Sequence, residues 1–189
     1  MSEPTSVTPV QSGRGLAQLN PAPEQVQRFS LRVVGAPGPF AEVQATAQYD
    51  VSNEAECGHI NPASGTAERI TSQETLSLQP AADGSWHGEV ALDLLQDQDY
   101  YGRGVCRWAL TEVRVRLRAT GADGETRFVA ALPLQALQTG SKVTRWFWNG
   151  GYPRSEAADY PDMGMDSPQG YRAELRDALF AVELNAGGV

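Results

Sequence analysis

The stretch Glu112–Leu132, EVRVRLRATGADGETRFVAAL, decides the fold class of this chain of 189 residues. Aliphatic side chains occupy every second position from Val113 to Leu117 and alternate with arginines, until a Gly-Ala-Asp-Gly run interrupts the pattern. Successive side chains of a strand point to opposite faces, and Asp-Gly readily adopts the positive φ angles of tight hairpin turns. The stretch therefore predicts two antiparallel strands, residues 112–120 and 125–132, each with one buried face.

The same alternation recurs along the chain, in residues 29–33, 43–49, 76–78, 86–92 and 180–184. A second Asp-Gly turn, Ala82–Gly84, would pair residues 75–80 with residues 85–94. Strands with one wet face, separated by Gly, Pro and Asp turns, are typical of antiparallel sheets that pack on each other. We therefore predict a mostly β fold, an antiparallel β-sandwich of two packed sheets, in a single domain over residues 27–189.

The alternation changes phase ahead of residue 113. From Cys106 to Leu110 the apolar residues hold even positions, whereas from Val113 to Leu117 they hold odd positions. A strand cannot change the face that it buries without an extra residue. We expect a bulge or bend within Ala109–Glu112, with the aliphatic residues beyond it in the core. Arg114, Arg116 and Arg118 would then lie on a solvated face, paired to carboxylates of neighbouring strands.

The first 26 residues contain four prolines, several Ser, Thr and Gln, and no apolar periodicity. Such a composition does not bury enough surface to offset chain entropy, so we expect a flexible, disordered tether over residues 1–26. It lacks the charged and apolar regions of a signal peptide, so export would require a leader absent from this sequence. A tether of this kind suits a lipid-anchored envelope protein, and a disordered leader on a soluble protein is the alternative.

The formal net charge is −8, from 15 Lys and Arg against 23 Asp and Glu. Nucleic acids are bound largely through Lys and Arg, so the composition argues against a nucleic-acid partner. No apolar run approaches the roughly 20 residues that span a bilayer. The charge favours a basic protein partner, because opposite fields speed encounter, or it serves solubility alone.

The chain contains two cysteines, Cys57 and Cys106. An even, minimal count fits one disulfide in an oxidising compartment, or two buried thiols in the cytosol. We expect the disulfide, which would stabilise the fold by on the order of 4 kcal/mol through loop closure.

Few residues are arranged for catalysis or for cofactor binding. There is no GxSxG, Walker or GxGxxG motif, and only His59 and His87 could serve as an imidazole base. Asp97–Gly102 begins like a calcium loop, but Trp108 occupies the twelfth position where a bidentate glutamate is needed. We expect no catalytic set, no cofactor and no metal site.

The alternation stops between Trp146 and Tyr171, in a segment rich in aromatic and acidic residues. Long irregular segments in a domain are usually functional or disordered. Trp and Tyr anchor interfaces at low entropy cost, and acidic residues around them would speed association. We expect at least one residue of Trp146–Trp148 in the core. The candidate partner-binding residues are Trp146, Trp148, Tyr152, Asp159, Tyr160, Asp162 and Asp166.

Two blocks, Cys57-Gly-His-Ile-Asn-Pro-Ala-Ser-Gly-Thr66 and Asp97-Gln-Asp-Tyr-Tyr-Gly-Arg-Gly-Val-Cys-Arg-Trp108, carry a resemblance to known proteins. With the arginine-striped strand and the Arg-Trp-Phe-Trp block, they resemble small bacterial envelope lipoproteins of the immunity-protein type, over roughly residues 55–150. Such proteins neutralise antibacterial toxins delivered by secretion systems. The resemblance implies that the two cysteines pair and that the protein is periplasmic, with an N-terminal lipid anchor. It supplies no catalytic residues.

Together these observations predict a non-catalytic periplasmic binding protein that occludes a secreted effector enzyme. A carbohydrate-binding module for cell-wall glycans is one alternative, because β-sandwiches often stack sugars on exposed tryptophans. A structural component of a secretion apparatus is another, and an uncharacterised hydrolase ranks last.

Overall fold

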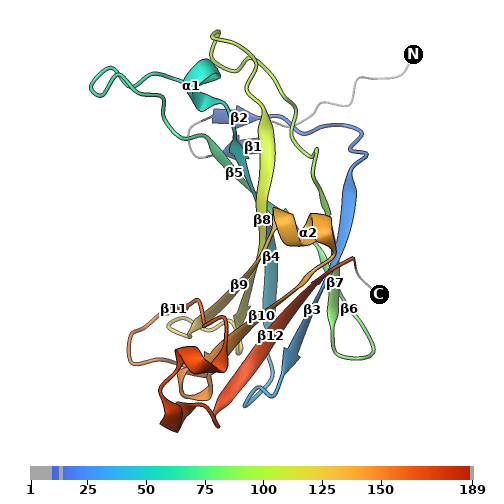
Figure 1. The fold of residues 1–189 in the computed structure, drawn as a ribbon, viewed down its shortest axis with the longest axis vertical. Coiled ribbons are helices and arrows are strands. Elements are labelled where there is room, and N and C mark those ends of the chain that lie inside the picture. The colour runs from blue at the N-terminus through green and yellow to red at the C-terminus, as the bar shows by residue number, and fades with distance from the viewer. Residues whose placement is uncertain (1–9, 13–14, 188–189) are drawn as a thin grey trace. The chain divides into compact units, whose positions relative to one another are not determined.

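A computed structural model of the chain describes residues 10–12 and 15–187 (Figure 1). The described chain is mostly β, with two five-stranded sheets and one two-stranded sheet. The predicted fold class, a mostly β protein with two packed sheets, is confirmed.

Contacts divide the chain into two compact units, each assembled from three separate segments. In the described chain, unit 1 comprises residues 10–12, 15–26, 47–74 and 90–111, and unit 2 comprises residues 27–46, 75–89 and 112–187. That residues 27–189 form a single domain stays a prediction.

The first five-stranded sheet contains the hairpin predicted around Ala82–Gly84. Its strands, in spatial order, are β10 (Lys142–Trp148), β12 (Leu179–Ala186), β3 (Val26–Val34), β7 (Trp86–Ala91) and β6 (Leu78–Pro80). The β6–β7 pair is antiparallel, and Gly84 takes a φ of 83° in its turn. This conformation is open to glycine because it carries no Cβ, so the Asp-Gly prediction is confirmed.

The second five-stranded sheet contains the hairpin predicted from Glu112 to Leu132. Its strands, in spatial order, are β11 (Pro161–Asp162), β9 (Arg127–Pro133), β8 (Trp108–Arg118), β4 (Glu42–Val51) and β5 (Thr71–Leu76). The β8–β9 pair is antiparallel and runs from Glu112 opposite Pro133 to Leu117 opposite Phe128. The sheet is mixed rather than wholly antiparallel, because the two residues of β11 pair in parallel with β9.

The face that β8 buries changes where the sequence predicts it. Leu110 and Val113 are 3% and 0% exposed, so the buried positions switch from even to odd between them, and the pairing with β9 begins at Glu112. The predicted burial of Val113, Val115 and Leu117 is confirmed, because all three are fully buried.

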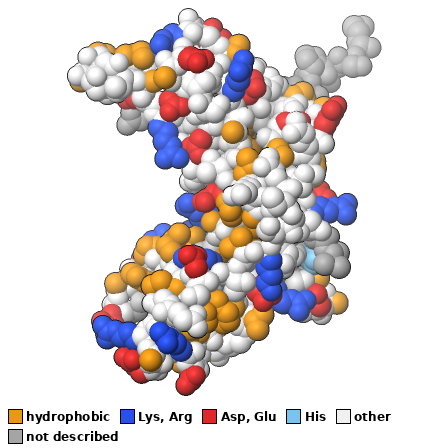
Figure 2. Space-filling model, in the orientation of Figure 1, with side chains coloured by type: hydrophobic (Ala, Val, Ile, Leu, Met, Phe, Trp, Pro, Cys, Tyr) orange, Lys and Arg blue, Asp and Glu red, His pale blue; other side chains and the backbone are white. Residues whose placement is uncertain are grey.

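The arginines of β8 are paired to carboxylates. Glu42 of β4 lies 3.4 Å from Arg116 and 2.9 Å from Arg118, and the hydrogen bond from Arg118 lowers the pKa of Glu42. Arg114 pairs with Glu112 of its own strand instead of a neighbouring one. Figure 2 shows basic and acidic side chains interspersed over the molecular face that it draws.

Phenylalanines form the core of unit 2 and join its two sheets. Phe128 of β9 lies edge-on to Phe147 of β10 and to Phe180 of β12, with ring centroids 5.4 and 5.2 Å apart. All three rings are fully buried, and burying each contributes roughly 2 kcal/mol relative to exposure. Phe147 confirms that the Trp146–Trp148 block supplies a core residue.

Unit 1 holds the N-terminal strands and a short helix, namely β1 (Val10–Ser12), β2 (Gly15–Ala17) and α1 (Glu54–Cys57). Unit 2 also contains α2 (Leu134–Thr139) and the 3₁₀ turns η1 (Asn149–Gly151), η2 (Pro168–Gly170) and η3 (Ala173–Leu175).

The predicted tether, residues 1–26, falls partly outside the described residues, which omit 1–9 and 13–14. Its later part is not free. Leu19 pairs with Leu95, and the Asp93 carboxylate accepts hydrogen bonds from the backbone amides of Glu24 and Gln25 at 2.9 and 3.0 Å. These amides therefore bond to an acceptor 69 and 68 residues along the chain, and the tether over residues 1–26 stays a prediction.

Candidate functional site

The end of β10 and the segment between β10 and β12 line an open hollow of about 550 Å³ in unit 2. We call it the loop hollow and define it by six of its lining residues: Trp148, Tyr160, Asp162, Met163, Met165 and Tyr171. Three of them, Trp148, Tyr160 and Asp162, are predicted partner-binding residues. The hollow therefore lies where the alternating pattern of the sequence stops.

Large apolar side chains are exposed at this hollow. Of the seven exposed large hydrophobic residues in the described chain, four line it: Trp148 at 40%, Tyr160 at 47%, Met163 at 48% and Met165 at 43%. Figure 2 shows hydrophobic side chains gathered in the region where Figure 1 places β9, β10 and β11. Contiguous apolar patches on a protein surface usually mark a binding site, whereas single exposed residues do not.

Two glycines allow the aromatic and thioether side chains to lie where they do. A Cβ on Gly150 would fall 2.2 Å from the Trp148 ring, so the indole rests directly against the glycine backbone. Gly164 has a φ of 63°, and a Cβ there would lie 2.6 Å from the Trp146 carbonyl oxygen. Beside it, Trp146 and Met165 exchange two backbone hydrogen bonds of 2.9 and 2.8 Å, which dock the loop on β10.

Arg145 of β10 fixes the turn that carries the two methionines. Its guanidinium donates to the carbonyl oxygens of Met163 and Gly164 at 2.8 and 2.9 Å and pairs with the carboxylate of Asp166. The Arg145 side chain is only 24% exposed. A charged donor bound to several carbonyl groups holds this turn in place before any ligand arrives.

A half-buried carboxyl group belongs to the wall of the hollow. Asp162 accepts a hydrogen bond from the Gly164 amide at 2.9 Å, but burial raises the pKa of its carboxyl above the ordinary value. Burial also raises the pKa of Tyr171 to about 12, with the charge of Asp162 adding to the effect, and the Tyr171 hydroxyl donates to the Trp146 carbonyl at 2.7 Å. The ionised form of Asp162 is therefore incompletely compensated.

The other predicted contact residues do not line the hollow. Trp146 is half-buried on β10, and Tyr152 lies edge-on to Phe40 and donates to the Pro39 carbonyl at 2.5 Å. Asp159 has a φ of 55°, and its carboxylate accepts from the Gly124 amide at 3.1 Å. Together with Asp166, which pairs with Arg145, these residues support the loop.

Sequence reasoning missed Met163, Met165 and Tyr171. The spacing Met-Gly-Met was the available signal, because both thioethers flank a residue that turns the chain. Methionine is apolar, flexible and polarizable, and is common on surfaces that accommodate varied partners.

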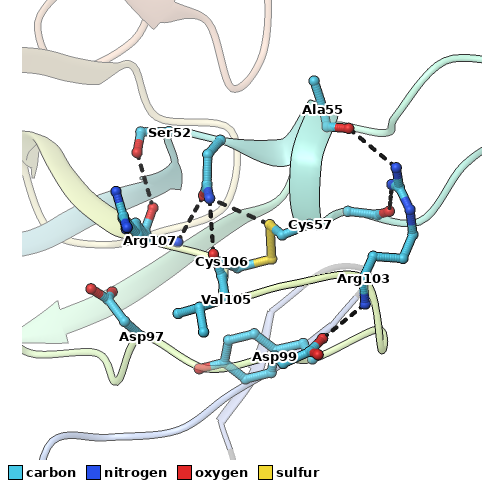
Figure 3. Close-up of a disulfide and its surroundings, with 12 residues drawn as sticks. Ser52, Ala55, Cys57, Asp97, Asp99, Arg103, Val105, Cys106 and Arg107 are labelled. Atoms are coloured by element: carbon cyan, nitrogen blue, oxygen red, sulfur yellow. Dashed lines mark hydrogen bonds between the residues drawn. A yellow bond between two sulfur atoms is a disulfide. The ribbon is translucent and has the colours of Figure 1, made fainter.

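The disulfide region of unit 1 is the second place where chemistry-bearing residues gather (Figure 3). Cys57 and Cys106 are joined, with Cα atoms 5.3 Å apart, so the predicted disulfide is confirmed. Both cysteines are buried in a cluster with Val51 and Ile70, against which Tyr100, Tyr101 and Trp108 pack. The disulfide is compatible with an extracytoplasmic protein.

Polar groups around the disulfide bond to each other and to the backbone. Asn53 donates to the Val105 carbonyl at 2.8 Å and accepts from the Arg107 amide at 2.8 Å. Arg103 donates to the carbonyl oxygens of Ala55 and Gly58 at the end of α1 (Figure 3). The blocks around Cys57 and Cys106 are thus tied together by these bonds as well as by the disulfide.

Asp97 and Asp99, the two acids of the sequence that resembles the start of a calcium loop, also bond to the backbone of this region. Asp97 accepts from the Trp108 amide at 2.9 Å, and Asp99 accepts from the Arg103 amide at 3.0 Å. In the part of the chain that the structure describes, no group of three His, Cys, Asp or Glu residues is placed to hold a metal ion.

His87 of unit 2 lies in a short polar chain. Its Nε2 atom is 2.9 Å from the Ser85 hydroxyl, which also bonds to the Asp83 carboxylate at 2.5 Å. The serine stands between the acid and the histidine, whereas a nucleophilic triad places the histidine between the acid and the serine. This arrangement fixes the β6–β7 turn.

Over the described ranges, the structure has no helix that is both long and apolar enough to cross a membrane. Comparison of the chain with protein-family models, with curated proteins and with solved structures gave no match.

Proposed function

We propose that this is a non-catalytic binding protein of an oxidising compartment, which docks a protein partner on the loop hollow. One observation carries the proposal: Trp148, Tyr160, Met163 and Met165 are exposed together around one hollow. Aromatic residues dominate the energetics of protein interfaces, and methionine adapts to the shape of a partner.

The loop is held in place before binding, which favours affinity. Arg145 fixes the turn of the methionines, and the Trp148 indole rests on Gly150. Ordering a mobile segment on association costs free energy, so a segment that is already fixed retains more of its contact energy as affinity.

The partner that we propose is a secreted antibacterial effector enzyme, which the protein inhibits by occlusion in the periplasm, tethered there by an N-terminal lipid. Three things support this: the resemblance of the blocks around Cys57 and Cys106 to envelope immunity proteins, the net charge of −8, and the disulfide. Inhibition by occlusion requires a rigid docking surface and no chemistry.

The proposal is tested by capturing the partner from the native host and measuring its binding kinetics and activity. Trp148→Ala and Tyr160→Ala should each weaken binding by about 2 kcal/mol if these rings are central anchors. Val105→Ala is the matched control, since Val105 is 51% exposed and lies in unit 1. Unchanged binding in both aromatic variants would place the interface elsewhere. A captured enzyme that stays active when bound would exclude inhibition by occlusion.

A glycan-binding function is the second candidate, because two exposed rings stand beside the Asp162 carboxyl group in the same hollow. Sugars stack on aromatic faces and bond to carboxylates. Titration with soluble peptidoglycan fragments separates the two functions: saturable binding that Trp148→Ala removes supports the glycan, and absence of binding supports the protein partner.

A further inference from the structure

Both charged residues that line the loop hollow, within the part of the chain that the structure describes, are acidic. They are Glu156 and Asp162, and the rest of the lining is aromatic, thioether, small or hydroxyl-bearing. A ligand that matches such a site needs a long apolar body with a positive head. Among protein side chains, lysine and arginine have this form, with an aliphatic stem that lies along apolar surface and a cation at its end.

Asp162 provides the specific reason for a cation. Among the described residues, its side chain accepts one hydrogen bond, from the Gly164 amide at 2.9 Å, while a carboxylate has about four acceptor positions. The guanidinium of Arg145 donates to the carbonyls of Met163 and Gly164 and pairs with Asp166. Its charge acts on Asp162 from a distance and lowers the pKa of that carboxyl, but burial has the larger effect. A half-buried anion that has a single protein donor is stabilised by an arriving donor cation.

A neutral apolar side chain would have the opposite effect. It would bury the Asp162 carboxylate further and give it no partner, and burying an unpaired charge is costly. The aromatic rings of Trp148, Tyr160 and Tyr171 can in addition attract a cation through their negative faces. The hollow therefore has an apolar wall, and an uncharged occupant would bind there at a cost in free energy, because it would bury the Asp162 carboxylate without a partner.

We propose that the loop hollow is a receptor for one lysine or arginine side chain of the partner, with the stem against Trp148, Tyr160 and the two methionines and the cationic head at Asp162. This inference rests on the proposed docking function and adds the chemistry of the residue that enters. The overall charge of −8 fits this inference, because long-range attraction would draw a basic partner surface toward this protein before one of its cationic side chains enters the hollow.

Two small probes of the same size and shape test the inference without the partner: n-pentylammonium and pentan-1-ol. Each is titrated into the full chain, and binding is followed by NMR at the indole N–H of Trp148, assigned with Trp148→Phe. We expect n-pentylammonium to bind with a Kd of about 1 to 10 mM, a normal range for so small a ligand, and pentan-1-ol to bind about tenfold more weakly.

Asp162→Asn should reduce the affinity for n-pentylammonium about tenfold, because it removes a charge-assisted hydrogen bond. It should leave the affinity for pentan-1-ol unchanged or improved. Glu174→Gln is the matched control: it neutralises an exposed acid of the same loop that does not line the hollow, so both probes should bind as they do to the wild-type chain.

Three results would overturn the inference: equal binding of the two probes, no binding of n-pentylammonium, or equal losses in Asp162→Asn and Glu174→Gln. None of them affects the docking function, which stands or falls with the partner affinity of Trp148→Ala and Tyr160→Ala. If those variants bind the partner normally, the docking function fails whatever the probes do.

Discussion

The disulfide region of unit 1 and the loop hollow of unit 2 are both irregular, aromatic and acidic, yet their aromatic rings are used in opposite ways. Tyr100, Tyr101 and Trp108 pack against the buried disulfide cluster. Trp148 and Tyr160 are exposed. The first segment is held by a covalent bond and packed rings, and the second by an arginine and by close backbone contacts.

The difference shows that aromatic content alone does not mark a binding surface. Rings are available for binding only where the segment does not need them for its own stability. Arg145 and the Trp146–Met165 backbone bonds hold the loop of unit 2 without using Trp148 or Tyr160, so those rings remain available. We therefore expect mutations of the aromatic rings in the first region to change stability, and mutations of Trp148 and Tyr160 in the second to change binding.

Removing the disulfide should have the largest effect on stability. Cys57→Ser with Cys106→Ser frees a loop of 49 residues, and we expect the free energy of unfolding to fall by about 4 kcal/mol in urea titration. Thiol titration of the unfolded, non-reduced wild-type chain should find no free thiol. A loss below about 1 kcal/mol would mean that packing and hydrogen bonds alone hold the disulfide region.

Arg145→Met should have the next largest effect, because it removes a charged donor from the Met163 and Gly164 carbonyls. Hydrogen bonds to charged groups contribute roughly 1.5 to 3 kcal/mol, so we expect unfolding to become easier by about 2 kcal/mol. Partner binding should be lost in parallel. Arg172→Met, at an exposed arginine of the same loop, should change neither quantity. A stable variant with full binding would show that the turn needs no such support.

Gly150→Ala should alter the binding surface at little cost in stability. The new methyl group would meet the Trp148 ring at 2.2 Å, so the ring must move, but it is exposed and free to do so. We expect a stability change within about 1 kcal/mol, a shifted Trp148 indole signal in NMR and weaker partner binding. In Gly151→Ala the nearest atom lies 3.5 Å away, and the Trp148 signal should stay in place. Identical spectra for the two variants would contradict this account of Trp148.

Asp162→Asn should leave stability unchanged or raise it. Burial holds the pKa of Asp162 above its ordinary value, so the folded state binds this proton more tightly than the unfolded chain. The resulting stabilisation is complete below the ordinary pKa and is lost as the pH rises through the raised pKa. Asparagine keeps an acceptor for the Gly164 amide and carries no charge. In urea unfolding at about pH 7 the variant should have the larger free energy of unfolding, and at about pH 3 the difference from the wild type should vanish. A variant less stable at neutral pH would mean that the charge of Asp162 supports the fold.

Local patterns in the sequence were sufficient for much of the fold. The Asp-Gly turns and the phase change ahead of Val113 depend on residues close to one another in the chain, and the structure agrees with both. The disulfide followed from a count of two cysteines. β11 was not predictable, because its two residues carry no periodicity and its parallel pairing with β9 depends on the path of the whole loop.

The candidate site was only partly predictable for the same reason. Trp148 and Tyr152 are both aromatic residues of the same irregular segment, and the sequence does not distinguish them. Tyr152 packs on Phe40 and bonds to Pro39, more than 100 residues earlier, whereas Trp148 is exposed. Asp159 and Asp162 likewise differ in their partners, since Asp159 bonds to the distant Gly124 turn and Asp162 to the nearby Gly164 amide. Exposure is a tertiary property, and the alternating pattern that reveals it in strands is absent from the loop.

The position of β12 has a consequence for how the protein folds during its synthesis. Within the described residues β12 is the last strand, yet it lies inside its sheet, hydrogen-bonded to β10 on one side and to β3 on the other. While the ribosome is still making residues before Leu179, β3 and β10 each lack a neighbour and expose an open edge. Unpaired strand edges recruit other chains, so nascent or truncated products ending before Leu179 should be the form of this protein that aggregates and needs a chaperone.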